Sequence, residues 1–160
     1  MNTSEESLWE LVFTNREAVL ATTKRDGRPQ LSNVLYVIDR DTRMLRISTT
    51  EERAKTRNLR RDPRAVLHIT GDNFWEYSVV EGDATLSPVA ATPGDEACQK
   101  LLAVHSSFYG ELDPESFYRE MIENKRLVVE IPLERVYGII ATGGRRPQTD
   151  SEDAGAKSAP

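Results

Sequence analysis

A cation-rich segment between two strand patterns constrains this chain more than any other feature. Apolar and polar residues alternate over 44–48 before the segment, and apolar residues recur over 65–69 after it, as expected for two strands. The segment opens with Ser48 and two threonines, continues as a helical run and stops before Pro63, since the residue before a proline disfavours helical backbone. Hydroxyl side chains, free N–H groups and the helix dipole at such a helix start predict an anion site.

The charge of this segment favours a small anion over a nucleic acid. The whole chain has a formal net charge of −5, whereas residues 53–64 hold one acid, Asp62, against six cations: Arg53, Lys55, Arg57, Arg60, Arg61 and Arg64. A nucleic-acid-binding domain is normally basic over a broad surface, so we expect a local site for phosphate instead. The plainer alternative is a solvated helix face, on which Glu52 lies within reach of Arg57.

Turn and strand signals along the chain predict an α+β protein made mainly of antiparallel strands. Asp26-Gly27 is typical of a tight hairpin, and Gly82 inside a strand pattern predicts a bulge or kink. Beside the cationic helix, we expect strands at 18–24, 29–38, 44–48, 65–70, 77–86 and, as one strand or two, 126–140, and helices at 4–15, capped by Thr3, at 95–104 and at 113–124. Hairpin-joined strands with only short helices favour a small closed barrel.

Composition predicts a single domain without membrane or secreted character. With 38% hydrophobic and 29% charged residues, a chain of 160 residues suits one globular domain over 1–141. Residues 142–160 hold almost no apolar side chain, so we expect a disordered tail there. Short apolar runs, no signal-peptide pattern and a single cysteine, Cys98, together predict a cytoplasmic location.

No residue pattern predicts catalysis by the side chains of the protein alone. The sequence lacks a G-x-S-x-G motif, a metal-spaced cluster of His, Asp or Glu, and a Cys–His pairing signal. We therefore interpret His68, His105 and Cys98 as structural residues and expect no metal. If the protein is an enzyme, a bound cofactor carries the chemistry, and the anion site holds that cofactor.

Three stretches of the chain resemble the pyridoxamine-phosphate-oxidase-like split β-barrel superfamily. More narrowly, they are similar to its branch of flavin/deazaflavin oxidoreductases that use coenzyme F420, an 8-hydroxy-5-deazaflavin. The stretches are residues 21–34, residues 53–64, and Trp75-x-Tyr77 with Glu81-Gly82, and the similarity covers about residues 8–140. The resemblance implies an FMN-binding split barrel of Greek-key topology with short flanking helices. It also implies a homodimer that holds one cofactor in each of two clefts between the subunits.

The resemblance further implies which residues contact the cofactor. Its phosphate would lie against residues 48–57, with Arg53, Lys55 and Arg57 in the phosphate-binding positions. The strand at 30–33 would run beside the tricyclic ring, with Gln30 and Ser32 on the cofactor side. The implied contacts are Gln30, Leu31, Ser32, Asn33, Ser48, Thr49, Thr50, Arg53, Lys55, Arg57 and, from the other subunit, Asn73, Trp75 and Tyr77.

These expectations favour a cytoplasmic F420-dependent oxidoreductase. It would transfer a hydride between C5 of the cofactor and a small unsaturated or imine-type organic substrate. No catalytic residue is assigned, and a proton would come from the substrate, from solvent or from a cleft side chain such as Tyr77. The vitamin B6 oxidases carry a C-terminal segment that holds FMN and pyridoxal, and this chain lacks its counterpart, so pyridoxine-phosphate oxidation is not expected.

Two alternatives stay open at this point. FMN carries the same phosphate and ribityl arm as F420, so Arg53 and Lys55 do not discriminate between the two cofactors. The long anionic tail of F420 favours it through further cations, Arg57, Arg60 and Arg61. The second alternative is a non-catalytic protein that binds deazaflavin, flavin or haem on the same barrel. Neither a nucleic acid nor a membrane is an expected partner.

Overall fold

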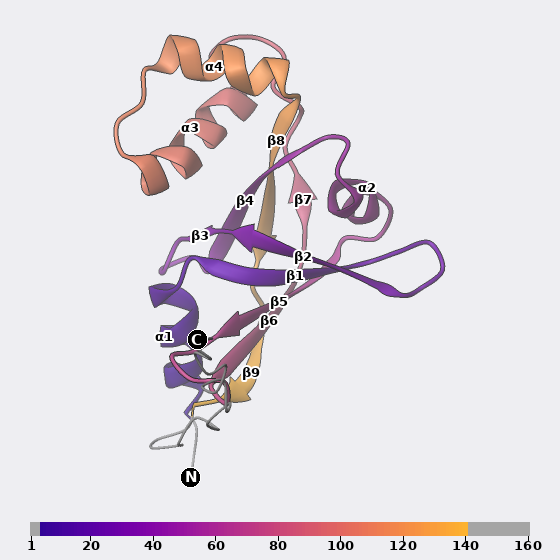
Figure 1. Ribbon diagram of the computed structural model, residues 1–160, viewed down its shortest axis with the longest axis vertical. Coiled ribbons are helices and arrows are strands. Elements are labelled where there is room, and N and C mark those ends of the chain that lie inside the picture. The colour runs from indigo at the N-terminus through magenta and orange to yellow at the C-terminus, as the bar shows by residue number, and fades with distance from the viewer. Residues whose placement is uncertain (1–3, 141–160) are drawn as a thin grey trace, which may run out of the picture.

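Two antiparallel sheets and four helices make up the structure, a computed structural model that describes residues 4–140 (Figure 1). In chain order the elements are α1 (Glu5–Thr14), β1 (Glu17–Thr23), β2 (Pro29–Leu35), β3 (Val37–Ile38), β4 (Met44–Thr50), α2 (Ala54–Arg61), β5 (Arg64–Thr70), β6 (Tyr77–Asp83), β7 (Thr85–Leu86), α3 (Glu96–Tyr109), α4 (Pro114–Glu123), β8 (Arg126–Pro132) and β9 (Arg135–Ile139). The first sheet has the order β2-β1-β5-β6-β9, and the second has the order β3-β4-β8-β7. This confirms the predicted α+β class with antiparallel strands.

The two sheets enclose one apolar core. Along β1, β4 and β5, buried and less buried residues alternate, so every second side chain points inward. Leu20, Ile47 and Leu67 are fully or almost fully buried between the sheets, and Trp9 and Val12 of α1 join the same cluster. Removing this much apolar surface from water is the main driving force for closing the barrel.

The predicted strand over 29–38 is interrupted at Tyr36, where the chain passes from one sheet to the other. Tyr36 is completely buried, and its hydroxyl donates a hydrogen bond of 2.7 Å to the carbonyl oxygen of Val12. Its backbone N–H donates to Arg16 rather than to a neighbouring strand. The chain therefore continues as β3 in the second sheet. The pattern of side chains alone does not show this, because Tyr36 keeps the inward alternation.

The predicted strand over 77–86 also divides, into β6 and β7. The bulge predicted at Gly82 is absent, because β5 and β6 pair without a break from Arg64↔Asp83 to Thr70↔Tyr77. A close approach to β8, and not a bulge, explains why this position is a glycine. A Cβ atom at Gly82 would overlap the backbone oxygen of Pro132 in β8, so β6 can cross β8 this closely only without a side chain.

The predicted helices agree with the structure to different degrees at their ends. Asp113 caps α4 by accepting a hydrogen bond from the Ser116 N–H, which confirms the expected helix with a proline in its first turn. The cap predicted at Thr3 is wrong, since Ser4 accepts from the Ser7 N–H at 3.1 Å. Thr3 itself, like the predicted tail over 142–160, lies outside the described residues. Helix α3 continues to Tyr109, beyond its predicted end.

The hydroxyl-rich turn predicted before the cationic helix is also wrong. Strand β4 continues through Thr50, and α2 begins only at Ala54. The N-cap position is Arg53, which makes no side-chain capping hydrogen bond. Seven residues of β4 pair with β8 in unbroken register, and this pairing holds the hydroxyl residues extended where local signals predict a turn.

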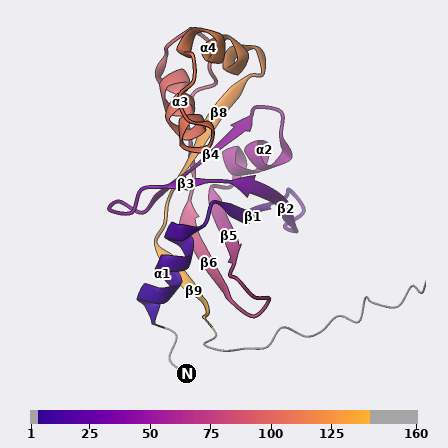
Figure 2. The ribbon, with the colours of Figure 1, turned by 60° about the vertical axis from the view of Figure 1, so that its left-hand side comes forward.

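Helices α3 and α4 form a separate layer over the upper part of β4 and β8 (Figures 1 and 2). Leu101, Phe117 and Met121 pack with Val128 of β8 in a second apolar cluster. Helix α2 lies on the other side of these strands in Figure 1. Among residues 4–140, no helix is long and apolar enough to cross a membrane.

Candidate cofactor site

A cavity of about 230 Å³ lies where β2, β4, α2, α3 and the start of β8 meet. We call it the Lys55 cavity. Its polar side chains are Asn33, Ser48, Lys55, His105 and Arg126, one from each of these five elements. Apolar and aromatic side chains of β2, β4 and α3 form the rest of its wall.

Two cations face this cavity without an acid to neutralise them. Within residues 4–140, no carboxylate lies within 4.0 Å of the charged group of Lys55 or of Arg126. Burial lowers the pKa of Lys55, and the positive charges of Arg53 and Arg126 lower it further. A partly buried cation gains most from a ligand that returns a negative charge, so this arrangement suits an anion.

Ser48 joins Arg126 to His105 inside the cavity. The Arg126 guanidinium donates to Ser48 Oγ at 2.8 Å, and His105 Nε2 lies 3.0 Å from the same oxygen. Burial lowers the pKa of His105, the positive charge of Arg126 lowers it further, and the negative charge of Glu120 opposes the shift. The imidazole is therefore neutral at pH 7, so the Ser48 hydroxyl can donate to Nε2 while it accepts from Arg126.

The three cations predicted to hold the phosphate together are separated in the structure. Lys55 lines the Lys55 cavity, whereas Arg57 lines a broader groove of about 860 Å³ beside the β1–β2 hairpin. Arg53 is exposed and lines neither hollow. Residues two apart on a helix point about 200° apart, so Lys55 faces away from Arg57, whereas Arg53 precedes the helix and its charge still acts on Lys55. We call the second hollow the basic groove. Its cations are Lys24, Arg25, Arg57, Arg60 and Arg61.

The predicted ring-side strand, β2, touches both hollows. Gln30 lines the basic groove and accepts a hydrogen bond of 3.2 Å from Thr22, while Asn33 lines the Lys55 cavity. Ser32 Oγ is buried and makes no hydrogen bond within the described part of the chain. A buried hydroxyl without a partner is rare in a folded protein and fits a group that a ligand would complete. Leu31 points to the opposite face and is 62% exposed.

Thr49 and Thr50 hold α2 in place and do not line the Lys55 cavity. Thr49 is buried on the core side of β4, with its hydroxyl 3.3 Å from that of Thr56. The Thr56 hydroxyl in turn donates to the backbone oxygen of Thr50 at 2.8 Å. These contacts tie the first turn of α2 to the end of β4, so they fix the position of Lys55.

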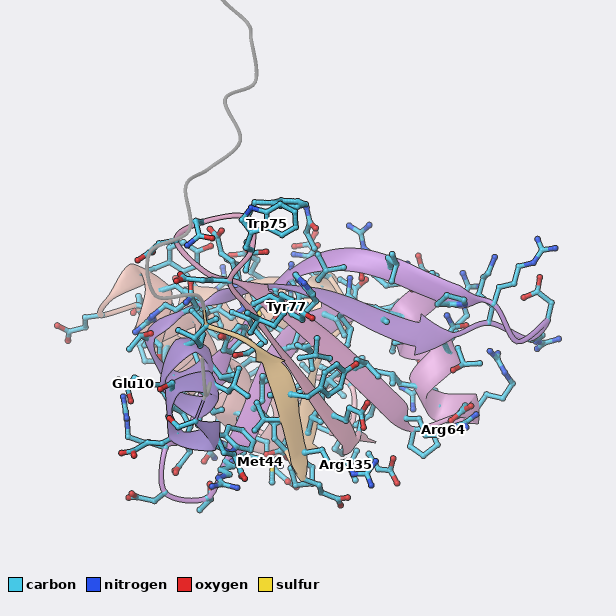
Figure 3. The ribbon with its side chains drawn as sticks, turned by 90° about the horizontal axis from the view of Figure 1, so that it is seen from below. Glu10, Met44, Arg64, Trp75, Tyr77 and Arg135 are labelled. Atoms are coloured by element: carbon cyan, nitrogen blue, oxygen red, sulfur yellow. The ribbon has the colours of Figure 1, made fainter. Side chains whose placement is uncertain are left out.

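The remaining predicted contacts, Asn73, Trp75 and Tyr77, lie around the β5–β6 turn and outside the Lys55 cavity. Figure 3 shows Trp75 and Tyr77 away from Arg64, which is at the other end of β5. Tyr77 stacks on His68 at 5.3 Å. His68 lines a further hollow, of about 450 Å³, on the outer face of the first sheet. A single protomer therefore does not bring these three residues to the cations.

Sequence reasoning missed two residues of the site, His105 and Arg126. His105 has no metal-ligand or catalytic spacing to mark it, and Arg126 follows a helix with no motif around it. Arg126 reaches the cavity because β8 pairs with β4 so that Arg126 lies opposite Thr50. Only that long-range pairing could have identified it.

Residues 6–139 match the sequence family described as pyridoxamine 5'-phosphate oxidase. The chain belongs to this family. Its members include oxidoreductases that bind flavin-type cofactors, and the predicted split-barrel resemblance is thereby confirmed. Among the described residues, no group of three or more His, Cys, Asp or Glu side chains could hold a metal ion.

Solved structures share the split-barrel fold of this family member. A structure described as an F420 reductase matches with a TM-score of 0.62 and 21% identity, covering 86% of this chain and 98% of the other. A conserved hypothetical protein from Mycobacterium tuberculosis matches with a TM-score of 0.62 and 24% identity, over 90% and 94% of the two chains. An FMN-binding, pyridoxamine 5'-phosphate oxidase-related protein from Nostoc punctiforme matches with a TM-score of 0.56 and 20% identity, over 85% and 83%. At these identities the likeness shows the fold alone.

Proposed function

We propose that this family member is an oxidoreductase that uses F420 and acts on a small unsaturated or imine-type organic substrate. The observation that carries the proposal is the pair of cations in the Lys55 cavity, Lys55 and Arg126, which no acid of the described chain neutralises. The orphan hydroxyl of Ser32 supports it, because it supplies a buried polar atom that a ligand group would satisfy. When bound, the deazaflavin supplies hydride transfer at its C5 carbon.

The residues of the chain have distinct roles in this proposal. Lys55 binds the cofactor phosphate, with its position fixed by the threonine contacts between β4 and α2. Strand β2, from Gln30 to Asn33, would run beside the ring, and its Asn33 lines the Lys55 cavity together with Ser48. Helix α3 covers the cavity with Phe108 and Tyr109 and excludes water from it.

The basic groove supports F420 over FMN. Its arginines Arg57 and Arg60 form no ion pair or hydrogen bond through their side chains within residues 4–140, and it adjoins α2, the helix that carries Lys55. F420 has a long anionic extension beyond the phosphate, which such a groove would accept, whereas FMN ends at the phosphate. Arg53 is the N-cap residue of α2 and would contact the phosphate from the exposed side of the helix start.

Reconstitution tests the proposed cofactor and reaction together. Purified protein is mixed with F420 or with FMN, and binding is followed by the deazaflavin absorbance or by flavin fluorescence. Reduced F420 is then supplied with a panel of activated alkenes and imines. We expect tighter binding of F420 and oxidation of its reduced form by at least one acceptor. Tight FMN binding with flavin-dependent turnover would reverse the choice of cofactor, and binding without turnover of any acceptor would favour a carrier protein.

We further propose that the protein forms a homodimer through the outer face of the first sheet. The Lys55 cavity, at about 230 Å³, is smaller than a usual ligand site of about 300–1,000 Å³. A second subunit would enlarge it and could bring Asn73, Trp75 and Tyr77 to the cofactor. The outer face exposes Leu31, Leu35, Tyr137 and Ile139, which are between 45% and 62% exposed. An apolar sheet face of this kind usually marks an interface.

Ile139→Asp is expected to convert the dimer into a monomer. Ile139 ends β9, an edge strand of this sheet, and a charge within an apolar interface loses its hydration without gaining a partner. The oligomeric state is measured by analytical ultracentrifugation. Ala103→Asp adds the same charge on the exposed side of α3 and serves as the control. A monomeric wild-type protein, or a variant that stays dimeric, would contradict the proposed interface.

A further inference from the structure

We infer that the substrate of this site carries a carboxylate and that Arg126 binds it. The inference rests on the proposed function, because it gives a role to Arg126, the cation of the Lys55 cavity that is not assigned to the cofactor phosphate. It starts from Arg126, which is partly buried at the first position of β8. One guanidinium nitrogen, Nη1, donates to Ser48 Oγ, and this is the only hydrogen bond of the Arg126 side chain within residues 4–140.

The hydrogen bond to Ser48 orients the guanidinium but leaves most of its donors free. An arginine side chain has five N–H donors in a fixed plane, and a carboxylate accepts two of them side by side. Ser48 is itself held by His105 on its other side, at 3.0 Å. The edge of the His105 ring packs against Phe117, with ring centroids 5.0 Å apart. Arg126 is therefore positioned before a ligand arrives, which favours a planar, two-oxygen partner.

The two cations of the cavity come from opposite sides of the strands. Lys55 projects from α2, whereas Arg126 lies at the α3–α4 side, bonded through Ser48 to His105 of α3. Figure 1 shows α2 and the α3–α4 layer on the two sides of β4 and β8. A lysine ammonium binds phosphate as a point charge, and an arginine fork matches a carboxylate. The cavity thus presents two cations of different chemistry, a lysine suited to phosphate and an arginine suited to a carboxylate.

The apolar wall of the cavity describes the rest of the substrate. Val34, Val104 and Phe108 line the cavity and present only apolar or aromatic surface. Neutral His105 adds no charge there, since burial and Arg126 both lower its pKa. The proposed function already limits the substrate to a small molecule. The substrate that fits is a small acid whose carboxylate is joined to a flat apolar or conjugated body.

The two histidines of the chain make this binding measurable without turnover. His105 contacts the Ser48–Arg126 pair, whereas His68 lies on the outer face of the first sheet. Sodium benzoate, a flat aromatic acid, and benzamide, its neutral counterpart, are each titrated into the protein, and the imidazole resonances are followed by NMR. Benzoate is expected to shift the His105 resonances to saturation, to leave those of His68 unchanged, and to bind at least about tenfold more tightly than benzamide.

Matched variants distinguish the role of Arg126 from that of Lys55, the proposed phosphate-binding residue. Arg126→Gln is expected to weaken benzoate binding about tenfold or more, Arg126→Lys to weaken it less, and the exposed Arg119→Gln to leave it unchanged. Unchanged His68 resonances show that each variant is folded. The inference is overturned if Arg126→Gln binds benzoate like the wild type, or if it weakens F420 and FMN binding as strongly as Lys55→Ala does. Benzoate binding lost in Arg126→Gln in a protein that binds neither cofactor would uphold the carboxylate site and refute the proposed cofactor instead.

Discussion

Lys55→Ala is expected to weaken cofactor binding by about 1.5–3 kcal/mol, which corresponds to roughly 10- to 150-fold in the dissociation constant. The variant removes the one ammonium group that faces the Lys55 cavity from α2. That group has no acidic partner in the described chain, so its removal leaves no carboxylate unpaired and no new charge exposed. The loss in affinity therefore reports the contact with the cofactor phosphate directly. Titration calorimetry with F420 and with FMN measures it.

Two further variants show whether the effect belongs to Lys55 alone. Lys125→Ala removes an exposed lysine whose nearest acid, Glu52, is 3.9 Å away, and it should leave affinity unchanged. Arg57→Ala, in the basic groove, should weaken F420 binding but not FMN binding, because only F420 has an anionic extension. If Lys55→Ala binds both cofactors as tightly as the wild type, Lys55 does not contact the cofactor phosphate, and the proposed phosphate site is wrong.

Local sequence signals predicted the elements that are stabilised by contacts between residues close in sequence. Helix α4 begins at its expected aspartate and proline because capping involves residues only a few positions apart. The same holds for the hairpin at Asp26-Gly27, where Gly27 adopts the left-handed backbone that glycine tolerates. Lys55 was found for a similar reason, since a dense run of cations in an acidic chain is visible without any knowledge of the fold.

Long-range pairing decided the features that the sequence did not show. Ser48 and its two following threonines have turn-like composition, yet pairing with β8 keeps them in a strand. The same register brings Arg126 beside Ser48, and the packing of α3 on β4 brings His105 there. Helical geometry separated Lys55 from Arg57, although the two are close in sequence. The site is thus composed of residues that only the closed barrel places together.

Gly82→Ala is expected to lower the free energy of unfolding by about 3 kcal/mol, the upper part of the usual range for overpacking. The added Cβ would overlap the backbone oxygen of Pro132 and lie 2.9 Å from Ile131 Cγ2. A backbone oxygen cannot change rotamer, so β6 or β8 has to shift. Strand β8 pairs with β4 along its whole length and begins at Arg126, so the strain acts on the strands that carry the site. Urea denaturation followed by circular dichroism measures the loss.

Gly110→Ala provides the matched control for this prediction. Gly110 has a positive φ of 76°, but no atom lies within 4 Å of where its Cβ would be. With φ 76° and ψ −152°, Gly110 lies in a backbone region that glycine occupies almost alone, so alanine there costs about 1–3 kcal/mol and leaves the barrel untouched. Gly82→Ala should also weaken cofactor binding, because β8 moves relative to α2, whereas Gly110→Ala should leave cofactor affinity unchanged. Little loss of stability in Gly82→Ala, with its cofactor affinity unchanged, would mean that the crossing of β6 and β8 is loosely packed and does not position Arg126.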